Sequence, residues 1–503
     1  MRAYTVEQPA GAFSEARERF EGMVAWLGGD EAAELTHEAL EARLAREGRD
    51  VLRQLMQDHL ALRAVREKRL DEVVGADGAR RGNVEGGHAR GLATVFGEVT
   101  VARKAYRAPG HGNLHPLDAA LNLPAEKHSH GMRRLAAEES ARGSFAEAAK
   151  ATERATGCTL GKRQVRQLAE RTAVDFDAFY AWRRPHLSAT DDVLVLTCDG
   201  KGIVMRPEAL RRATRQAAAR ATTKLQTRLS KGEKRHRKRM AEVGAVYDCA
   251  PVVRTPEDVL ARAEDGGGRR RKRPKARGKW LTASVVDDAR TVVAKLFDEA
   301  QRRDPQQRRP WVVLVDGHSH QLDCIHAEAA ARGLKVHIVL DFVHVLEYLW
   351  GAAWCFFKEG SPDAETWVHT QATKILHGRS SHVAAAIRRK ATCRHLKPSQ
   401  RKNADTCARY LMNKRPYLDY ATALANGWPI ATGVIEGACR HLVKDRMAIT
   451  GARWSLPGAE AILKLRALRS NGDFDDYWRF HLRQEYQRVH ASRYAHNQPP
   501  RPS

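Results

Sequence analysis

The stretch WVVLVDG, residues 311–317, is an unbroken apolar run that ends in an aspartate and a glycine. The stretch VLVLTCDG, residues 193–200, has the same form, with Asp199 in the place that Asp316 takes in the first. A short, continuous apolar run is typical of a buried strand in a parallel or mixed sheet. Functional groups of such sheets gather where the strands end. The two runs therefore predict an α/β core with two acidic side chains at one edge of its sheet.

Further strand and helix patterns surround these two runs. The spacing of apolar residues predicts strands at 243–247, 280–286 and 336–340, and helices at 289–302 and 324–332. In chain order this gives three strands, a helix, a strand, a helix and a strand. That order is the one expected of an RNase H-like α/β core.

A third acidic side chain, Glu436, stands near the start of a helix expected over residues 434–447. Phosphoryl transfer with two divalent cations about 4 Å apart needs hard oxygen ligands that converge from separate elements. Asp199, Asp316 and Glu436 would supply those carboxylates. An Asp-Gly pair after a strand is often only a turn, so it is the combination of the three acids that points to a metal site. Arg440 and Lys444 follow Glu436 on roughly the same helical face, where they could contact phosphates or form a solvated ion-pair face.

Two neighbouring residues leave alternatives open. Asp341 also ends an expected strand, so it rivals Asp316 as the second metal ligand. His344 either donates a hydrogen bond to the scissile phosphate or packs as an ordinary polar core residue.

The charge of the chain indicates a polyanionic partner. It has 503 residues, enough for several domains, and a formal net charge of +26. Two basic runs, residues 211–240 and 269–279, lie between expected strands of the core, and phosphate contacts are the role we expect for them. As solvated faces or linkers they would be unremarkable. The cations expected to bind DNA in these runs are Lys234, Arg235, Arg237, Lys238, Arg239, Arg271 and Lys272.

The first third of the chain is expected to be mostly helical. Helical patterns cover residues 14–70, and an alternating pattern at 92–106 predicts a strand or hairpin. Two short helices, 144–154 and 162–174, flank a turn at 157–161, which fits a helix-turn-helix. Its second helix begins with cations, so we expect Lys162, Arg163 and Arg166 to contact DNA.

Cysteine spacing and hydropathy bear on the compartment. The 8 cysteines never form a CxxC pair, which favours neither a zinc site nor a disulfide framework and indicates a reducing environment. The N-terminus lacks the apolar core of a secretory signal. The most apolar stretch, residues 336–357, carries Asp341, His344 and Glu347, which a membrane span would rarely tolerate. We expect a cytoplasmic, nucleoid-associated protein without a membrane partner.

Five motifs cover most of the expected core: CDGKGIVMRPEALR (198–211), RLSKGEKRHRKRMAEVGAVYD (228–248), VDGHSHQ (315–321), VLDFVHVLEYLW (339–350) and WPIATGVIEGACRHLVKDRMAITGARWS (428–455). In these motifs the chain resembles the ISKra-type bacterial insertion-sequence transposases, distant relatives of the Mutator-like DDE enzymes. Weaker likenesses at 96–110 and 161–180 extend the resemblance to nearly the whole chain.

The resemblance implies an RNase H-like fold with a helical insertion before the last acid. By motif, Asp199, Asp316 and Glu436 match the three catalytic acids, while Asp341 and His344 match a separate D-x-x-H signature. It further implies two Mg²⁺ ions per site, for which Mn²⁺ would substitute, and double-stranded DNA as partner, both transposon ends and target. A homodimer or higher homo-oligomer is expected, because two ends must be cut together.

The expected domains follow from these patterns. They are a helical region (1–80), a small β-containing segment (81–130), a helix-turn-helix-like region (131–188), the first part of the core (189–347) with basic insertions at 206–242 and 264–279, a helical insertion (348–427), the last part of the core (428–475) and a C-terminal tail (476–503). Two rival functions share the same features: a structure-selective two-metal DNA nuclease, and a non-catalytic DNA-binding regulator derived from a transposase.

Overall fold

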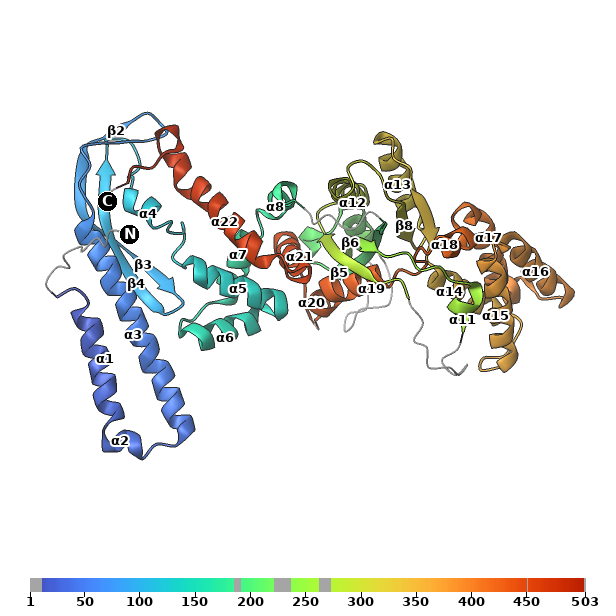
Figure 1. Cartoon of the computed structure of the whole chain (residues 1–503), viewed down its shortest axis with the longest axis horizontal. Helices are drawn as coiled ribbons and strands as arrows, with labels where there is room; N and C mark the ends of the chain where they lie inside the picture. Colours follow the sequence, from blue (N-terminus) through green and yellow to red (C-terminus); the bar gives the residue numbers. More distant parts are fainter. Residues whose placement is uncertain (1–10, 185–190, 221–236, 262–272, 450, 502–503) are drawn as a thin grey trace. The chain divides into compact units, whose positions relative to one another are not determined.

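The computed structural model describes residues 11–184, 191–220, 237–261, 273–449 and 451–501. The chain forms two compact units, residues 1–181 together with 473–503, and residues 182–472 (Figure 1). The C-terminal residues therefore belong to the same unit as the N-terminal ones. Basic residues Lys234, Arg235, Arg271 and Lys272 lie outside the described residues.

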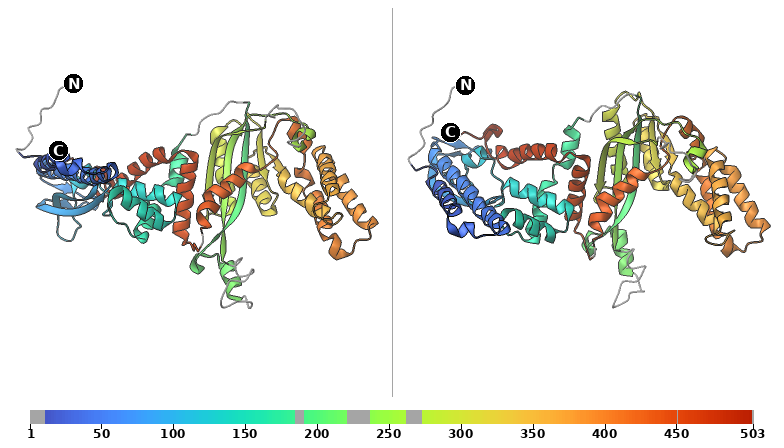
Figure 2. Two further views of the ribbon diagram at one scale, coloured as in Figure 1. Left: turned by 90° about the horizontal axis from the view of Figure 1, so that it is seen from below. Right: turned by 60° about the horizontal axis from the view of Figure 1, so that its bottom comes forward.

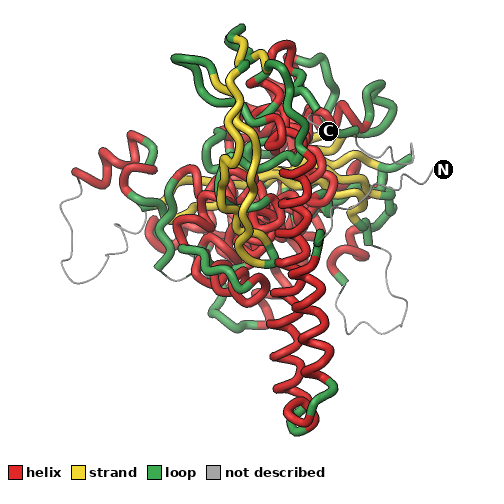
Figure 3. The backbone as a smooth tube through the Cα atoms, turned by 90° about the vertical axis from the view of Figure 1, so that its left-hand side faces the viewer, coloured by secondary structure: helices red, strands yellow, loops and turns green. Residues whose placement is uncertain are grey.

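The first unit begins with two long helices that pack against each other, α1 (Ser14–Leu27) and α3 (His37–Arg66), with α2 (Asp30–Ala33) between them (Figure 3). Two glycines at 28 and 29 end α1, and the Thr36 side chain caps α3 by accepting from the Ala39 amide. The helices expected over residues 14–70 are thus confirmed as far as Arg66, where α3 ends.

A β-ribbon follows the long helices. Strands β3 (Asn83–Thr94) and β4 (Gly97–Arg107) pair antiparallel from Asn83↔Arg107 to Thr94↔Gly97, with an irregularity between Glu85 and His88. The hairpin expected at 92–106 is confirmed and is longer than the alternation indicated. The short elements around it are β1 (Val73–Val74), β2 (Arg80–Arg81) and α4 (Pro116–Ala120).

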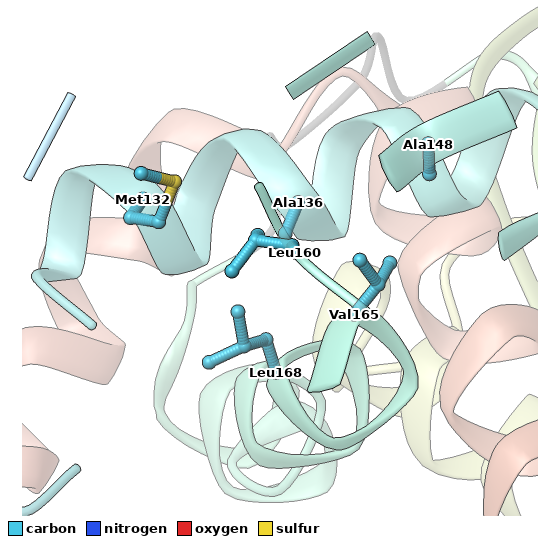
Figure 4. Close-up of a cluster of buried hydrophobic side chains, with 6 residues drawn as sticks. All are labelled: Met132, Ala136, Ala148, Leu160, Val165 and Leu168. Atoms are coloured by element: carbon cyan, nitrogen blue, oxygen red, sulfur yellow. The ribbon is translucent and has the colours of Figure 1, made fainter. Parts of the chain in front are cut away.

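Three helices then enclose a small apolar core: α5 (His130–Arg142), α6 (Phe145–Thr156) and α7 (Lys162–Thr172). Figure 4 shows the buried side chains that join them, among them Met132, Leu160 and Val165. Gly157 ends α6 in the left-handed region at φ 73°, which turns the chain toward α7. The two short helices and the turn predicted between 144 and 174 are therefore present. The last helix before the second unit is α8 (Phe176–Trp182).

The segment 476–503, expected as a tail, is mostly the helix α22 (Phe474–Val489), followed by the 3-10 turns Ala491–Arg493 and Ala495–Asn497. The Tyr477 hydroxyl donates to the Thr172 carbonyl, and Arg133 of α5 contacts His481 and Glu485. Hence the helix α22 is a packed part of the first unit.

The second unit is built on a five-stranded mixed sheet of strand order β7-β6-β5-β8-β9. Strands β7, β6 and β5 pair antiparallel, and β5, β8 and β9 pair parallel. The strands are β5 (Val193–Val204), β6 (Lys238–Cys249), β7 (Ala276–Ser284), β8 (Trp311–Val315) and β9 (His337–Leu340). All five strands were expected, but β5, β6 and β7 start or end several residues beyond their apolar runs.

The helices of the sheet lie on both of its faces. A side chain at Gly244 of β6 would come within 2.7 Å of Leu296, so α12 (Ala289–Arg303) packs closely on that face. The neighbouring residue Val243 pairs with Asp199, which contacts Cys439. Because successive strand residues point to opposite faces, the segment around Cys439 covers the other face. The helix α13 (Ser319–Ala331) connects β8 to β9.

Residues between β9 and the last part of the core form a helical bundle beside the sheet (Figure 2). Its first helix, α14 (Phe342–Ala353), begins six residues before the expected boundary at 348. The others are α15 (Pro362–Leu376), α16 (Ser380–Cys393), α17 (Pro398–Asn413), the 3-10 turn Arg415–Tyr417 and α18 (Tyr420–Ala425).

The helix expected at 434–447 is not uniform. It consists of α19 (Gly433–Ala438), a π-helical segment Cys439–Lys444 and α20 (Asp445–Met447). π-Helical turns inside helices are rare and often occur at functional sites. The remaining helices are α9 (Arg212–Arg220), α11 (Pro256–Leu260) and α21 (Leu456–Asn471), of which α21 packs on β7.

Candidate active site

Three aspartates lie at the same level of three neighbouring strands. Thr197 of β5 pairs with Leu314 of β8, so Asp199 and Asp316, two residues further on, are side by side. Val315 pairs with Leu340, which places Asp341 beside Asp316. Neighbouring strands are about 4.8 Å apart, and side chains at one level of parallel strands share a face. The sheet register therefore brings together acids that are far apart in sequence.

Glu436 reaches the same place from another element. It projects from the first turns of α19, which packs on β5 and β6. One cavity of about 160 Å³ is lined by all four acids. Its lining residues are Cys198, Asp199, Asp316, Asp341, Val343, His344, Glu347, Thr432, Ile435 and Glu436.

Asp199 is half-buried and accepts two hydrogen bonds. The Gly200 amide donates to Oδ1 at 2.6 Å, and the Cys439 thiol donates to Oδ2 at 3.3 Å. Burial and the nearby Asp199 carboxylate raise the pKa of the Cys439 thiol, so this group stays protonated and remains a donor. The π-helical segment is what places Cys439 against β5.

Asp316 is also half-buried, at the turn between β8 and α13. Its Oδ1 accepts from the His318 amide at 2.9 Å, a local turn contact. The following Gly317 has φ +91°, a conformation that other residues rarely adopt. A side chain there would also lie 3.1 Å from Leu340, so the glycine allows β9 to approach the turn.

Asp341 is buried, with 4% of its surface exposed, and both of its oxygens are engaged. Oδ1 accepts from the Val343 amide at 3.1 Å and the Thr432 amide at 3.3 Å, and Oδ2 accepts from the Thr432 hydroxyl at 2.7 Å. It therefore caps α14 and fixes the residue before α19. The Thr432 hydroxyl is also 3.4 Å from Glu436 Oε1, which links Asp341 to the Glu436 carboxylate.

His344 lines the cavity from the first turn of α14. Its Nδ1 is 3.0 Å from Glu347 Oε2, and its ring meets the edges of Tyr348 and Tyr410 at centroid distances of 5.2 and 6.1 Å. The imidazole is thus held by neighbours and still borders the acids.

The four acids fit a hard divalent cation by chemistry and by position, because all are oxygen donors around one cavity. In the described part of the chain, however, no three His, Cys, Asp or Glu side chains lie close enough together to hold a metal ion. Like charges repel, and Asp199, Asp316 and Asp341 each accept from a nearby protein donor. Rotation of the carboxylates about their own side-chain bonds would be needed for convergence.

The predicted cations of the second unit differ in their surroundings. Arg440 is 73% exposed and lies 3.8 Å from Asp445, and Lys444 and Lys238 are exposed. Arg237 is half-buried. Arg239 donates to the carbonyls of Val285 and Ala209, so it holds the end of the sheet together. These two contacts hold part of its guanidinium inside the fold, and its expected phosphate contact stays a prediction.

The cations predicted on the helix-turn-helix lie in the first unit, at the start of α7. Lys162 and Arg163 are exposed. Arg166 is half-buried and pairs with Glu170 at 3.6 Å, one turn along the same helix. The exposed pair is available to a phosphate, and Arg166 is partly neutralised.

Four residues around the cavity escaped the sequence analysis: Cys439, Thr432, Tyr410 and Tyr420. The two residues near Glu436 carried a usable signal, because helical neighbours three or four positions apart share a face. Tyr410 and Tyr420 carried none, since their contacts with the strand ends depend on how the helical bundle folds back.

Among the residues that the structure describes, none of the helices has both the length and the apolar character needed to cross a membrane. No model of a known protein family matches the chain, and no curated protein matches it significantly.

Proposed function

We propose that this chain is a DDE transposase with an RNase H-like core, and that it cuts and joins insertion-sequence DNA at terminal inverted repeats. The observation that carries the proposal is the alignment of Asp199, Asp316 and Asp341 on three parallel strands, with Glu436 facing them across one cavity. Acids gathered in this way at strand ends are what two-metal phosphoryl transfer requires.

Asp199, Asp316 and Glu436 would hold the metal ions, and Asp341 would orient Glu436 through Thr432. Two Mg²⁺ ions, or Mn²⁺ in their place, supply charge stabilisation for the attacking and leaving oxygens of the phosphodiester. His344 borders the acids and would donate a hydrogen bond to the phosphate. Asp316 is favoured over Asp341 as a ligand because Asp341 is already committed to three protein donors.

DNA binding would begin at α7. Its N-terminal end presents Lys162 and Arg163 to solvent, in the position that meets DNA in helix-turn-helix proteins. Arg440, Lys444 and Lys238 would contact phosphates near the cavity. A homo-oligomer would hold the two transposon ends together. The protein would act in the cytoplasm, associated with the nucleoid.

The test uses duplexes taken from the DNA that flanks the gene on each side. With Mg²⁺, the full-length protein should nick these duplexes at one position and join pre-cleaved 3′ ends to a target plasmid. Asp199→Asn should bind the duplexes with unchanged affinity and show neither reaction.

Each rival function predicts a different result. A structure-selective nuclease would nick DNA and never join strands. A regulator would bind DNA equally well with or without Asp199 and cleave none. If wild-type protein binds the flanking duplexes but neither cuts nor joins them in Mg²⁺ or Mn²⁺, the proposed function is wrong.

A further inference from the structure

Two tyrosines of the helical bundle donate hydrogen bonds to the strand ends that carry the aspartates. The Tyr410 hydroxyl of α17 donates to the Asp316 carbonyl at 3.3 Å, and the Tyr420 hydroxyl of α18 donates to the Leu340 carbonyl at 3.0 Å. Leu340 is the residue immediately before Asp341. The bundle therefore contacts the backbone at both acidic positions on its side of the sheet.

Tyr410 is held in place by its neighbours. Its ring stacks on Tyr348 of α14 with centroids 4.0 Å apart and planes at 15°, and His344 lies edge-on to both rings. Its hydroxyl would also be 3.6 Å from a side chain at Gly317, so it sits directly against the turn after Asp316. A glycine turn has little stiffness of its own, and an outside contact is needed to fix it.

Tyr420 is fully buried, and its ring meets Phe342 edge-to-face at 5.2 Å. Phe342 in turn donates its amide to the Ile430 carbonyl, on the segment between α18 and α19 that leads to Glu436. One tyrosine thus fixes the end of β9 beside both Asp341 and the segment that leads to Glu436.

Both hydroxyls remain donors at any ordinary pH. Burial raises the pKa of Tyr410, and the nearby Tyr348 and Asp316 raise it further. Burial also raises the pKa of Tyr420. Each carbonyl therefore receives a hydrogen bond that does not titrate with the acids.

We propose that Tyr410 and Tyr420 are positioning residues, through which the helical bundle sets the acids of the cavity in the arrangement that binds metal. The inference rests on the proposed function for the role of the metal. In this role the helical bundle stabilises the metal-binding arrangement of the strand ends. Without the two tyrosine hydrogen bonds, the strand ends would adopt that arrangement for a smaller fraction of the time. The apparent affinity for metal is proportional to the fraction of molecules in the metal-binding arrangement, so it falls when that fraction falls.

The experiment measures Mn²⁺ binding to the full-length protein from the electron paramagnetic resonance signal of free Mn²⁺. The variants are Tyr410→Phe, Tyr420→Phe and the double variant, each of which keeps its ring and loses one hydroxyl. The matched control is Tyr348→Phe, the other member of the stacked pair, whose hydroxyl makes no hydrogen bond among the described residues. Asp199→Asn identifies which bound Mn²⁺ belongs to the cavity.

We expect Tyr410→Phe and Tyr420→Phe each to weaken Mn²⁺ binding at the cavity by about fivefold, the size of one net hydrogen bond, and the double variant by more. Tyr348→Phe should bind Mn²⁺ like the wild type. In the cleavage reaction, half-saturation by Mn²⁺ should shift by the same factor while half-saturation by DNA does not move. If the tyrosines had a purely structural role, the variants would instead have a lower melting temperature and would bind both Mn²⁺ and DNA more weakly.

Unchanged Mn²⁺ affinity in the double variant would overturn the inference and leave the proposed function intact, provided that Asp199→Asn still removes bound Mn²⁺. If Asp199→Asn removes none, the metal site itself is wrong, and the proposed function fails with it. A loss of Mn²⁺ affinity in Tyr348→Phe equal to that in Tyr410→Phe would also overturn the inference, because ring packing would then explain both.

Discussion

Two clusters of acidic side chains, one in each unit, have opposite surroundings. In the first unit, Asp175 and Glu485 are almost fully covered and each is paired with a cation, Arg488 for both and Arg133 for Glu485. In the second unit, five acids line one cavity: Glu347 contacts His344, and within the described ranges Asp199, Asp316, Asp341 and Glu436 form no ion pair with Lys, Arg or His. A buried charge is costly unless it is compensated.

The network of the first unit is complete in its hydrogen bonding. Arg133, with no exposed surface, donates to Glu126, Glu485 and the Nε2 atom of His481. Because arginine only donates, His481 accepts at Nε2 and uses its Nδ1 proton to donate to Asp175 at 2.7 Å. In this cluster, Arg133, Asp175 and Glu485 each have a charged or hydrogen-bonding partner within the same unit. Asp199, Asp316, Asp341 and Glu436 have no cation partner in the described ranges, so the proposed metal site is placed there, and the buried network around Arg133 is given a structural role.

The largest expected effect is on catalysis. Asp316→Asn keeps the size of the side chain and removes the charge, so cleavage of the flanking duplexes should fall by at least about a thousandfold, or about 4 kcal/mol of transition-state stabilisation. Stability should stay the same or rise slightly, because one of several neighbouring like charges is gone. Cleavage rate and urea unfolding of the same preparation measure both quantities.

A loss of stability without a loss of cleavage in Asp316→Asn would reverse the comparison, since it would make the cavity the structural cluster. Asp405→Asn is the control in the same unit. Asp405 pairs with Arg401 on the surface of α17, and its replacement should change neither quantity appreciably.

The next effect belongs to the first unit. Arg133→Met leaves a buried cluster of acids and a histidine without its central donor, which should lower the free energy of unfolding by about 3–5 kcal/mol. Arg134→Met is the matched control, because Arg134 is 39% exposed and its pairs with Glu138 and Asp475 are superficial. Its replacement should cost about 1 kcal/mol or less. Equal losses in the two variants, measured by urea unfolding, would show that the buried network contributes no more to the free energy of unfolding than the exposed ion pairs do.

The two regions also differ in how far the sequence could foresee them. The apolar run at 311–315 predicted β8 with its exact bounds. The run has five residues and is followed at once by Asp316 and Gly317, so the strand could not be placed further along the chain. The gathering of Asp199, Asp316 and Glu436 around one cavity was expected from strand ends and a helix start, and the structure places all three there. The run that forms β8 is local in sequence, and the meeting of the acids follows from the general rule that strand ends of one sheet share an edge.

What the sequence could not supply depends on pairings between distant segments. Arg239 sits in a basic run that favours a phosphate contact, yet the extension of β6 carries it back to the carbonyls of Val285 and Ala209. Likewise, no periodicity indicates that Asp175 meets Arg488, since α22 returns to the first unit only after the whole second unit has been crossed.

A smaller effect appears on acidification. Burial alone would raise the pKa of Asp175, but the hydrogen bonds from His481 and Arg488 outweigh it and lower the pKa to about 2. The stabilisation is therefore fully present above the unfolded pKa near 4 and is lost as pH falls toward 2. With a side chain only 8% exposed, this carboxyl should contribute roughly 2 kcal/mol.

Urea unfolding of the wild type and of Asp175→Asn between pH 5 and pH 2 measures that contribution. The difference between them should be largest at pH 5 and shrink toward zero at pH 2. Asp476→Asn, which removes an acid that is 59% exposed and paired with Arg479, should follow the wild type throughout. A constant difference across this range would mean that Asp175 stabilises the unit by packing and not by its charge.

The smallest effect should come from replacing Asp341. This acid lines the cavity, like Asp199 and Asp316, and is also buried with its oxygens hydrogen-bonded, like the acids of the first unit. It lines the cavity, yet its oxygens are satisfied by Val343 and Thr432, as a buried acid of the first unit would be by cations. In Asp341→Asn the remaining oxygen still accepts the two amides, and the Thr432 hydroxyl can turn to donate to Glu436. We therefore expect a loss of about 1 kcal/mol in stability and a roughly tenfold slower cleavage, far milder than in Asp316→Asn. Cleavage by Asp341→Asn and Asp316→Asn, assayed side by side, ranks the two; if Asp341→Asn proves the more damaging, Asp341 is the metal ligand and Asp316 the residue that only shapes the turn.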